Sequence, residues 1–135
     1  MNKKNNAAKP FIETRNHHES ELAEDYVEII ADILSTKGEA RVSDISENLG
    51  VSHVTVIRTI ERLKKKGLID STSPITLTLQ GEKMAKFSKE RHIFLLKYLT
   101  ALGIPEQVAA IDVEGMEHHV SQTTMDAFAA HLKLL

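Results

Sequence analysis

Apolar residues recur at steps of three and four along most of the chain, a spacing that predicts a mainly helical protein. One amphipathic helix of about 15 residues is expected from Leu22 to Gly38, with Tyr26, Ile30 and Ile33 on its apolar face. Gly38 marks its end, because glycine readily adopts the left-handed conformation that follows helix C-termini. Residues 1–20 contain few strongly apolar side chains, and they are predicted to form a disordered tail.

Two further helices follow, joined by a tight turn. The pattern predicts a short helix that begins at Ser43 and stops at Gly50, and a second helix over about 53–66 that is capped by Ser52. The buried face of the second helix is expected to consist of four apolar side chains, Val54, Ile57, Ile60 and Leu63. Two helices joined by a glycine-containing turn, the second of them basic, are typical of a helix-turn-helix.

The residues after this pair predict a β-hairpin. Residues 68–69 and 75–79 are β-branched or alternating runs, and small polar residues with Pro74 separate them. A hairpin directly after a recognition helix is the wing of a winged-helix domain. We therefore expect a winged-helix DNA-binding domain over residues 21–82, with a protein-binding winged helix as the main alternative.

The last part of the chain, residues 83–135, is predicted to be helical throughout. One helix ends at Gly103, another covers about 106–118, and the last begins near Ser121. Three helices of this size cannot bury all their apolar faces alone, so we expect a homodimer. The predicted fold class is mainly α, with an N-terminal winged helix-turn-helix and its small β-hairpin wing followed by a helical dimerisation domain.

Composition narrows the possible functions. The chain has 135 residues and no cysteine, which excludes a disulfide framework and favours a cytoplasmic protein. No apolar run is long enough to span a membrane, so no membrane partner is expected. The net charge of −2 hides a basic stretch from Arg58 to Lys66 in which Glu61 is the single acid. A local basic stripe on a mildly acidic protein suits contact with the phosphates of double-stranded DNA.

The second helix of the helix-turn-helix supplies the candidates for DNA contact. Its N-terminal part enters the major groove in such domains, and the positions there that are expected to be exposed and to read bases are His53, Thr55, Val56, Arg58 and Thr59. Hydroxyls and cations contact phosphates, and the candidates for that role are Ser52, Thr55, Arg58, Arg62, Lys64 and Lys65. A symmetric dimer with two such helices would bind a palindromic operator.

Residues 112–119 carry a different chemical pattern, three carboxylates and two imidazoles within eight residues. On a helix, Glu114, Glu117 and His118 would share one face, within reach of one ion. Carboxylate and imidazole suit Mn²⁺, Fe²⁺, Co²⁺ or Zn²⁺. A solvated acidic helix face with incidental histidines is the alternative, and the role of His119 stays open. The C-terminal domain is thus predicted to bind metal as well as to dimerise.

Four segments together resemble one known family. They are residues 24–28, residues 40–45, the pair Arg91 and His92, and the segment 112–119. In this order they are similar to the manganese-responsive branch of the diphtheria toxin repressor family, from about Glu21 to the C-terminus. The resemblance implies a DNA-binding transcriptional regulator, not an enzyme, that represses manganese uptake genes when it is loaded with Mn²⁺.

The resemblance also implies a binuclear site with two Mn²⁺ ions per subunit. The residues at the positions of the family's ligands are Asp25, Glu28, His92, Glu114, Glu117 and His118. By analogy, Glu28 and Glu117 bridge the two ions. Asp25 and Glu28 are also spaced to share one helix face. In the iron-responsive branch a sulfur-bearing residue occupies the position of Asp25. The carboxylate in this chain therefore favours Mn²⁺ over Fe²⁺. Metal is expected to favour the orientation of the winged helices that binds DNA.

Three alternatives remain at this point. One is a regulator of the same family that responds to Fe²⁺ or Zn²⁺. Another is a winged-helix repressor that does not depend on metal. The third is a di-metal hydrolase, since such a ligand set can activate water. No candidate nucleophile or phosphate-binding glycine loop accompanies the ligands, and the hydrolase leaves the winged helix unexplained.

Overall fold

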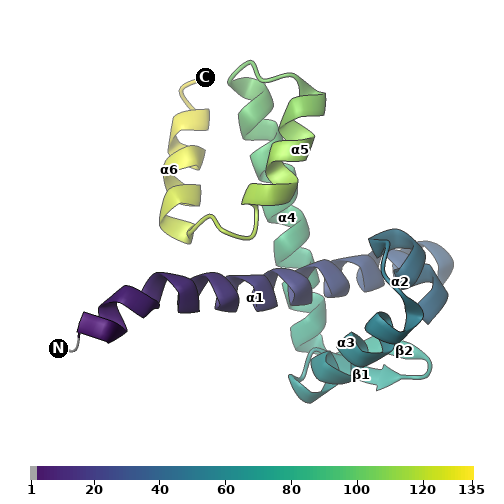
Figure 1. Ribbon diagram of the computed structural model, residues 1–135. Coiled ribbons are helices and arrows are strands. Elements are labelled where there is room, and N and C mark those ends of the chain that lie inside the picture. The colour runs from purple at the N-terminus through teal and green to yellow at the C-terminus, as the bar shows by residue number, and fades with distance from the viewer. Residues whose placement is uncertain (1–2) are drawn as a thin grey trace. The chain divides into compact units, whose positions relative to one another are not determined.

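The computed structural model describes residues 3–135, with side chains from His18 onward. The chain divides into two compact units, residues 21–87 and residues 88–135 together with the chain up to Ser20. The division at residue 88 falls inside one helix, α4 (Leu79–Ala101) (Figure 1). The domain limits expected from the sequence, at residues 20 and 82, stay predictions.

The unit of residues 21–87 is a winged helix-turn-helix. After α1 (Lys3–Lys37) come α2 (Val42–Leu49), α3 (His53–Lys65), and the antiparallel strands β1 (Ile69–Thr72) and β2 (Ile75–Leu77), and α4 begins directly afterwards (Figure 1). The predicted fold class is thereby confirmed for this part of the chain. The backbone of α1 is helical from Lys3, within the segment for which a disordered tail is predicted.

Local hydrogen bonds explain where the helices begin and end. Gly38 has a φ of 80° and its N–H donates to the carbonyl of Leu34 at 3.0 Å, which ends α1 as predicted. The hydroxyl of Ser52 accepts from the N–H of Thr55 at 3.2 Å and caps α3, also as predicted. The prediction that Ser43 begins α2 is wrong. The N-cap is Arg41, whose N–H donates to Oδ2 of Asp44 at 3.1 Å.

The wing is anchored to the first turn of α4. Thr78 precedes α4; its N–H donates to the Leu68 carbonyl at 3.1 Å and its hydroxyl to the Gly67 carbonyl at 2.6 Å. A Cβ at Gly81 would overlap the carbonyl oxygen of Leu68, so only glycine allows α4 to approach the residue that precedes β1 so closely. The second strand was expected to run to residue 79, but β2 ends at Leu77, Thr78 lies between strand and helix, and Leu79 begins α4.

Each unit has its own hydrophobic core. In the winged helix, apolar side chains of α1, α2, α3, both strands and the start of α4 form one buried cluster that includes Tyr26, Ile45 and Ile60. The other core joins the later part of α4 to α5 (Glu106–Met116) and α6 (Gln122–Leu132). There the ring of Tyr98 stacks on Phe128 with the ring centroids 4.6 Å apart. Within the described residues, no helix is both long and apolar enough to cross a bilayer.

Candidate metal centre and nucleic-acid interface

The end of α5 creates a buried polar cluster. The helix stops at Met116, two residues before the predicted end, so Glu117 and His118 lie in the turn that follows. Glu117 is 3% exposed and His118 is also buried. A carboxylate and an imidazole rarely lose contact with water unless polar partners compensate them. Glu117 and His118 should therefore have polar partners inside the protein.

Glu117 has an imidazole partner on each carboxylate oxygen. Nδ1 of His92, on α4, donates to Oε2 at 2.6 Å, and Nε2 of His118 lies 3.3 Å from Oε1. A second contact from α4 holds the main chain, because Nη1 of Arg91 donates to the carbonyl oxygen of Glu117 at 2.8 Å. Three of the predicted ligands, His92, Glu117 and His118, are thus in direct contact.

The charge state of Glu117 follows from this environment. Burial raises the pKa of its carboxyl, but the hydrogen bonds and charges of His118 and then His92 outweigh burial, and the pKa lies below the ordinary value. The carboxylate is therefore ionised at neutral pH. An ionised oxygen donor between two imidazoles is a donor set that suits a divalent transition-metal ion.

The other predicted ligands have different surroundings. Glu114 lies on the last turn of α5 with an exposed side chain, so the expected single face with Glu117 and His118 on one helix is replaced by a helix-to-turn junction. Asp25 and Glu28 lie one turn apart on α1 in the unit of residues 21–87, and both are half-buried. His119, left open from the sequence, is exposed, and its ring lies edge-on to that of His18 at 6.4 Å between centroids.

The side of α3 that faces the core differs from the predicted one. Val56 is fully buried and Thr59 is 5% exposed, so the expectation that these two are exposed, base-reading positions is wrong. Val54 and Ile57, expected in the core, are 57% and 49% exposed. Residues 56, 59, 60 and 63 form the i, i+3, i+4, i+7 stripe of a helix. Burial of Thr59 costs little because its hydroxyl donates to the carbonyl of Thr55 at 2.8 Å.

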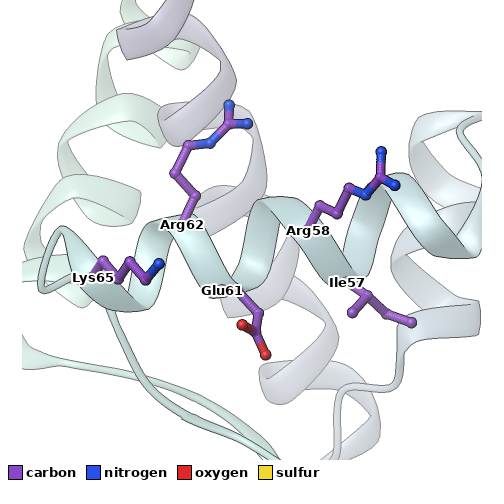
Figure 2. Close-up of a pocket in the computed structure, with 5 residues that line it drawn as sticks. All are labelled: Ile57, Arg58, Glu61, Arg62 and Lys65. Atoms are coloured by element: carbon purple, nitrogen blue, oxygen red, sulfur yellow. The ribbon is translucent and has the colours of Figure 1, made fainter.

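The solvent side of α3 carries the remaining DNA-contact candidates. Ile57, Arg58, Glu61, Arg62 and Lys65 line a shallow hollow along this side. Figure 2 shows Arg58 and Arg62 extending from the helix in one direction and Ile57 and Glu61 in another. The other candidates are also exposed: Ser52, His53, Thr55 and Lys64. Cations and hydroxyls along one exposed helix side suit contact with a polyanion.

The chain thus joins a winged helix with a basic, exposed recognition helix to a helical unit with a buried cluster of one carboxylate and two imidazoles. This combination suits a protein that binds both DNA and a metal ion. Residues 18–73 match the family described as "Iron dependent repressor, N-terminal DNA binding domain". Residues 78–135 match "Iron dependent repressor, metal binding and dimerisation domain". The chain belongs to the iron-dependent repressor family, and it is a metal-dependent, DNA-binding transcriptional regulator.

Individual relatives agree with the family. "Transcriptional regulator MntR" of Escherichia coli O6:H1 is 45% identical over 120 residues, which are 87% of this chain and 77% of the relative. "HTH-type transcriptional regulator MntR" of Lysinibacillus sphaericus is 39% identical over 108 residues, 78% of each chain. The solved structure "Manganese-dependent transcriptional repressor complex with manganese" superposes with a TM-score of 0.74 at 29% identity, over 84% of this chain and 53% of that one. Because the family and these relatives are transcriptional regulators, the alternative of a di-metal hydrolase has no support.

Proposed function

We propose that this protein is a Mn²⁺-activated repressor of manganese uptake genes that acts in the cytoplasm as a homodimer on a palindromic operator. The observation that carries the proposal is the buried Glu117, whose two carboxylate oxygens contact His92 and His118. Oxygen and nitrogen donors without thiolate suit Mn²⁺ among the divalent ions. The similar solved structure of a manganese-dependent repressor, which is a complex with manganese, supports the same ion.

The proposed ligands are those implied by the family resemblance. His92, Glu114, Glu117 and His118 come from α4 and the end of α5, and Asp25 and Glu28 come from α1. Two ions per subunit, bridged by Glu28 and Glu117, complete the proposal. The contacts of Glu117 with His92 and His118 support it, because they bring carboxylate oxygens and imidazole nitrogens together, and both are donors for a divalent cation.

The activation mechanism follows from the charges of these side chains. A bound divalent ion would compensate the repulsion between carboxylates of α1 and carboxylates at the end of α5 when the two groups approach one another. Without the ion, Asp25 and Glu28 would repel Glu114 and Glu117 on close approach, and this repulsion would disfavour an arrangement in which all six side chains serve one site. Occupancy is thereby coupled to the position of α1, which forms part of the winged-helix core. Such couplings are commonly worth about 1–3 kcal/mol.

Exposed apolar residues support the homodimer. Val108 and Ile111 on α5 are 48% and 74% exposed, and Ile93 on α4 is 56% exposed, all within the segment that matches a metal-binding and dimerisation domain. Large exposed apolar side chains within a segment that matches a dimerisation domain suit an interface between subunits. A two-fold dimer would present two α3 helices to two half-sites of one operator.

The proposed DNA contacts are now restricted to exposed residues. Seven of the sequence candidates remain: Ser52, His53, Thr55, Arg58, Arg62, Lys64 and Lys65. Val56 and Thr59 are dropped because they are buried. Val54 and Ile57 join the set, since an exposed aliphatic side chain on a recognition helix can contact the methyl group of thymine.

Operator binding tests the proposal directly. The protein is titrated at fixed salt against a palindromic duplex from upstream of a manganese transporter gene, in Mn²⁺, Fe²⁺ or Zn²⁺ and in chelator. Tight binding with Mn²⁺ and weak binding in chelator supports the proposal. Activation by Fe²⁺ or Zn²⁺ but not by Mn²⁺ would replace the proposed ion. Equal binding in Mn²⁺ and chelator would refute metal control altogether.

A further inference from the structure

Glu117 is held from α4 at two points by two consecutive residues. His92 bonds its carboxylate, with 2.6 Å between Nδ1 and Oε2, and Arg91 bonds its main chain, with 2.8 Å between Nη1 and the carbonyl oxygen. The family resemblance and the contacts among imidazoles and carboxylate account for His92. They give no role to Arg91, whose guanidinium has no lone pair and cannot ligate a metal.

The position of the Arg91 contact gives it a specific consequence. The carbonyl that Arg91 holds belongs to the peptide group between Glu117 and His118, so this hydrogen bond restrains the orientation of the peptide from which both side chains leave the chain. This peptide follows the last turn of α5, where the helix itself provides no partner for carbonyl groups. The positive guanidinium is also favourable at the negative end of the helix dipole.

We propose that Arg91 is a positioning residue for the metal site: it orients the peptide that joins Glu117 and His118 so that both side chains meet a divalent cation. The inference rests on the proposed metal-binding function and deepens it. Residues that orient ligands without touching the metal commonly contribute tenfold or more to metal affinity, because they remove conformations in which the ligands point away.

Charge alone predicts the opposite effect, which makes the proposal testable. Removing a cation near a cation-binding site should strengthen Mn²⁺ binding, whereas releasing the Glu117–His118 peptide should weaken it. Arg91→Met keeps the apolar stem of the side chain but removes the charge and the donors. Lys97→Met makes the same kind of change at an exposed position of the same helix, six residues further on. Arg91→Lys keeps a donor that can reach a carbonyl.

The experiment measures Mn²⁺ binding to the full chain without DNA, by the loss of the free-ion electron paramagnetic resonance signal. The Arg91→Met variant is expected to bind Mn²⁺ about tenfold or more weakly than the wild type. Lys97→Met should stay within about twofold of the wild type, since exposed charges are well screened. Arg91→Lys should recover most of the loss. Substituting Co²⁺ adds a spectroscopic test, because a displaced ligand changes the visible absorption of bound Co²⁺.

Three results would overturn the inference. Arg91→Met could bind Mn²⁺ as tightly as Lys97→Met, or more tightly than the wild type, as charge removal alone predicts. The Co²⁺ spectrum could stay the same while only the melting temperature of the metal-free protein falls, which is the result of a purely structural role. Absence of Mn²⁺ binding in the wild type would refute the proposed function itself, and the role of Arg91 with it.

Discussion

The polar residues of α3 and those that follow α5 differ in their exposure to solvent and in their partners. On α3, Arg58, Arg62 and Lys65 extend from an exposed helix side and line an open hollow (Figure 2). After α5, Glu117 and His118 are buried, and Glu117 is bonded by His92 within the same unit. The exposed cations of α3 are available to a large anionic partner, whereas the buried groups after α5 already contact one another.

This difference indicates how each site should respond to change. A buried carboxylate with hydrogen-bonded partners is preorganised, so removing one group disturbs the others and the effects are coupled. Exposed cations act through charge and are nearly independent of one another, so each should contribute a modest, salt-dependent share. Mutations at the two sites should therefore differ in size, and the largest effect is expected at the buried carboxylate.

Replacement of Glu117 by Ala should abolish the response to metal. The variant loses the proposed bridging ligand, so its operator affinity in Mn²⁺ should fall to the value in chelator, a change of about 5–150-fold for a typical coupling free energy. Glu106→Ala, at the exposed start of α5, is the matched control and should respond normally. Circular dichroism melting checks that both variants fold. A normal Mn²⁺ response in Glu117→Ala would contradict the ligand assignment.

Replacement of Arg58 by Ala should weaken operator binding about tenfold at every Mn²⁺ concentration. If Arg58 contacts a phosphate, the slope of log affinity against log salt should also decrease in magnitude by about one. Metal affinity should not change, which separates this variant from Glu117→Ala. Lys133→Ala, an exposed cation after α6, serves as the control for net charge. Undiminished operator affinity would remove Arg58 from the interface.

Neighbouring residues on α3 give a paired test of which side faces the core. Val56→Ala removes fully buried volume and should lower the free energy of unfolding by about 2 kcal/mol. Ile57→Ala, on the exposed side, should change it by less than about 0.5 kcal/mol but should weaken operator binding severalfold. Denaturant titration and operator binding are measured on both variants. The reverse pattern would restore the buried side expected from the sequence.

The smallest effect is expected for an exposed ion pair in the winged helix. The hydrogen bond from Nζ of Lys37, 2.9 Å from Oδ1, lowers the pKa of Asp44 below its ordinary value, aided by the N–H of Arg41. A lowered folded-state pKa stabilises the protein above the unfolded pKa, and this contribution disappears as pH falls through the folded value. Asp44→Asn should therefore melt slightly below the wild type at neutral pH and together with it in acid. A pH-independent difference would exclude the charge effect.

The sequence predicts much of the winged helix because its signals are local. Gly38 and Gly50 end helices and Ser52 begins one through contacts with residues at most four positions away. The sequence predicts the wrong buried side of α3, because Val54, Val56, Ile57 and Ile60 allow two apolar stripes along the helix. Only the packing of the domain selects between them, and Thr59 fits the core because it satisfies its hydroxyl within the helix.

The candidate metal site was predictable in composition but not in form. The density of acids and histidines in residues 112–119 indicates metal binding, yet the end of α5 at Met116 changes which side chains share a face. The contacts of His92 and Arg91 with Glu117 join residues that are 25 and 26 positions apart. No local pattern encodes such a pair. The resemblance to a known family supplied His92, whereas the role of Arg91 required the structure.

The central claim is that metal binding and DNA binding are coupled within one molecule, and it can be measured from the metal side. Thermodynamic linkage requires that the operator raise the affinity for Mn²⁺ by the same factor by which Mn²⁺ raises the affinity for the operator. Mn²⁺ binding is therefore measured with and without saturating operator duplex, with a scrambled duplex as control. The account predicts that the operator duplex tightens Mn²⁺ binding and that the scrambled duplex does not. Equal Mn²⁺ affinity in all three conditions would contradict it.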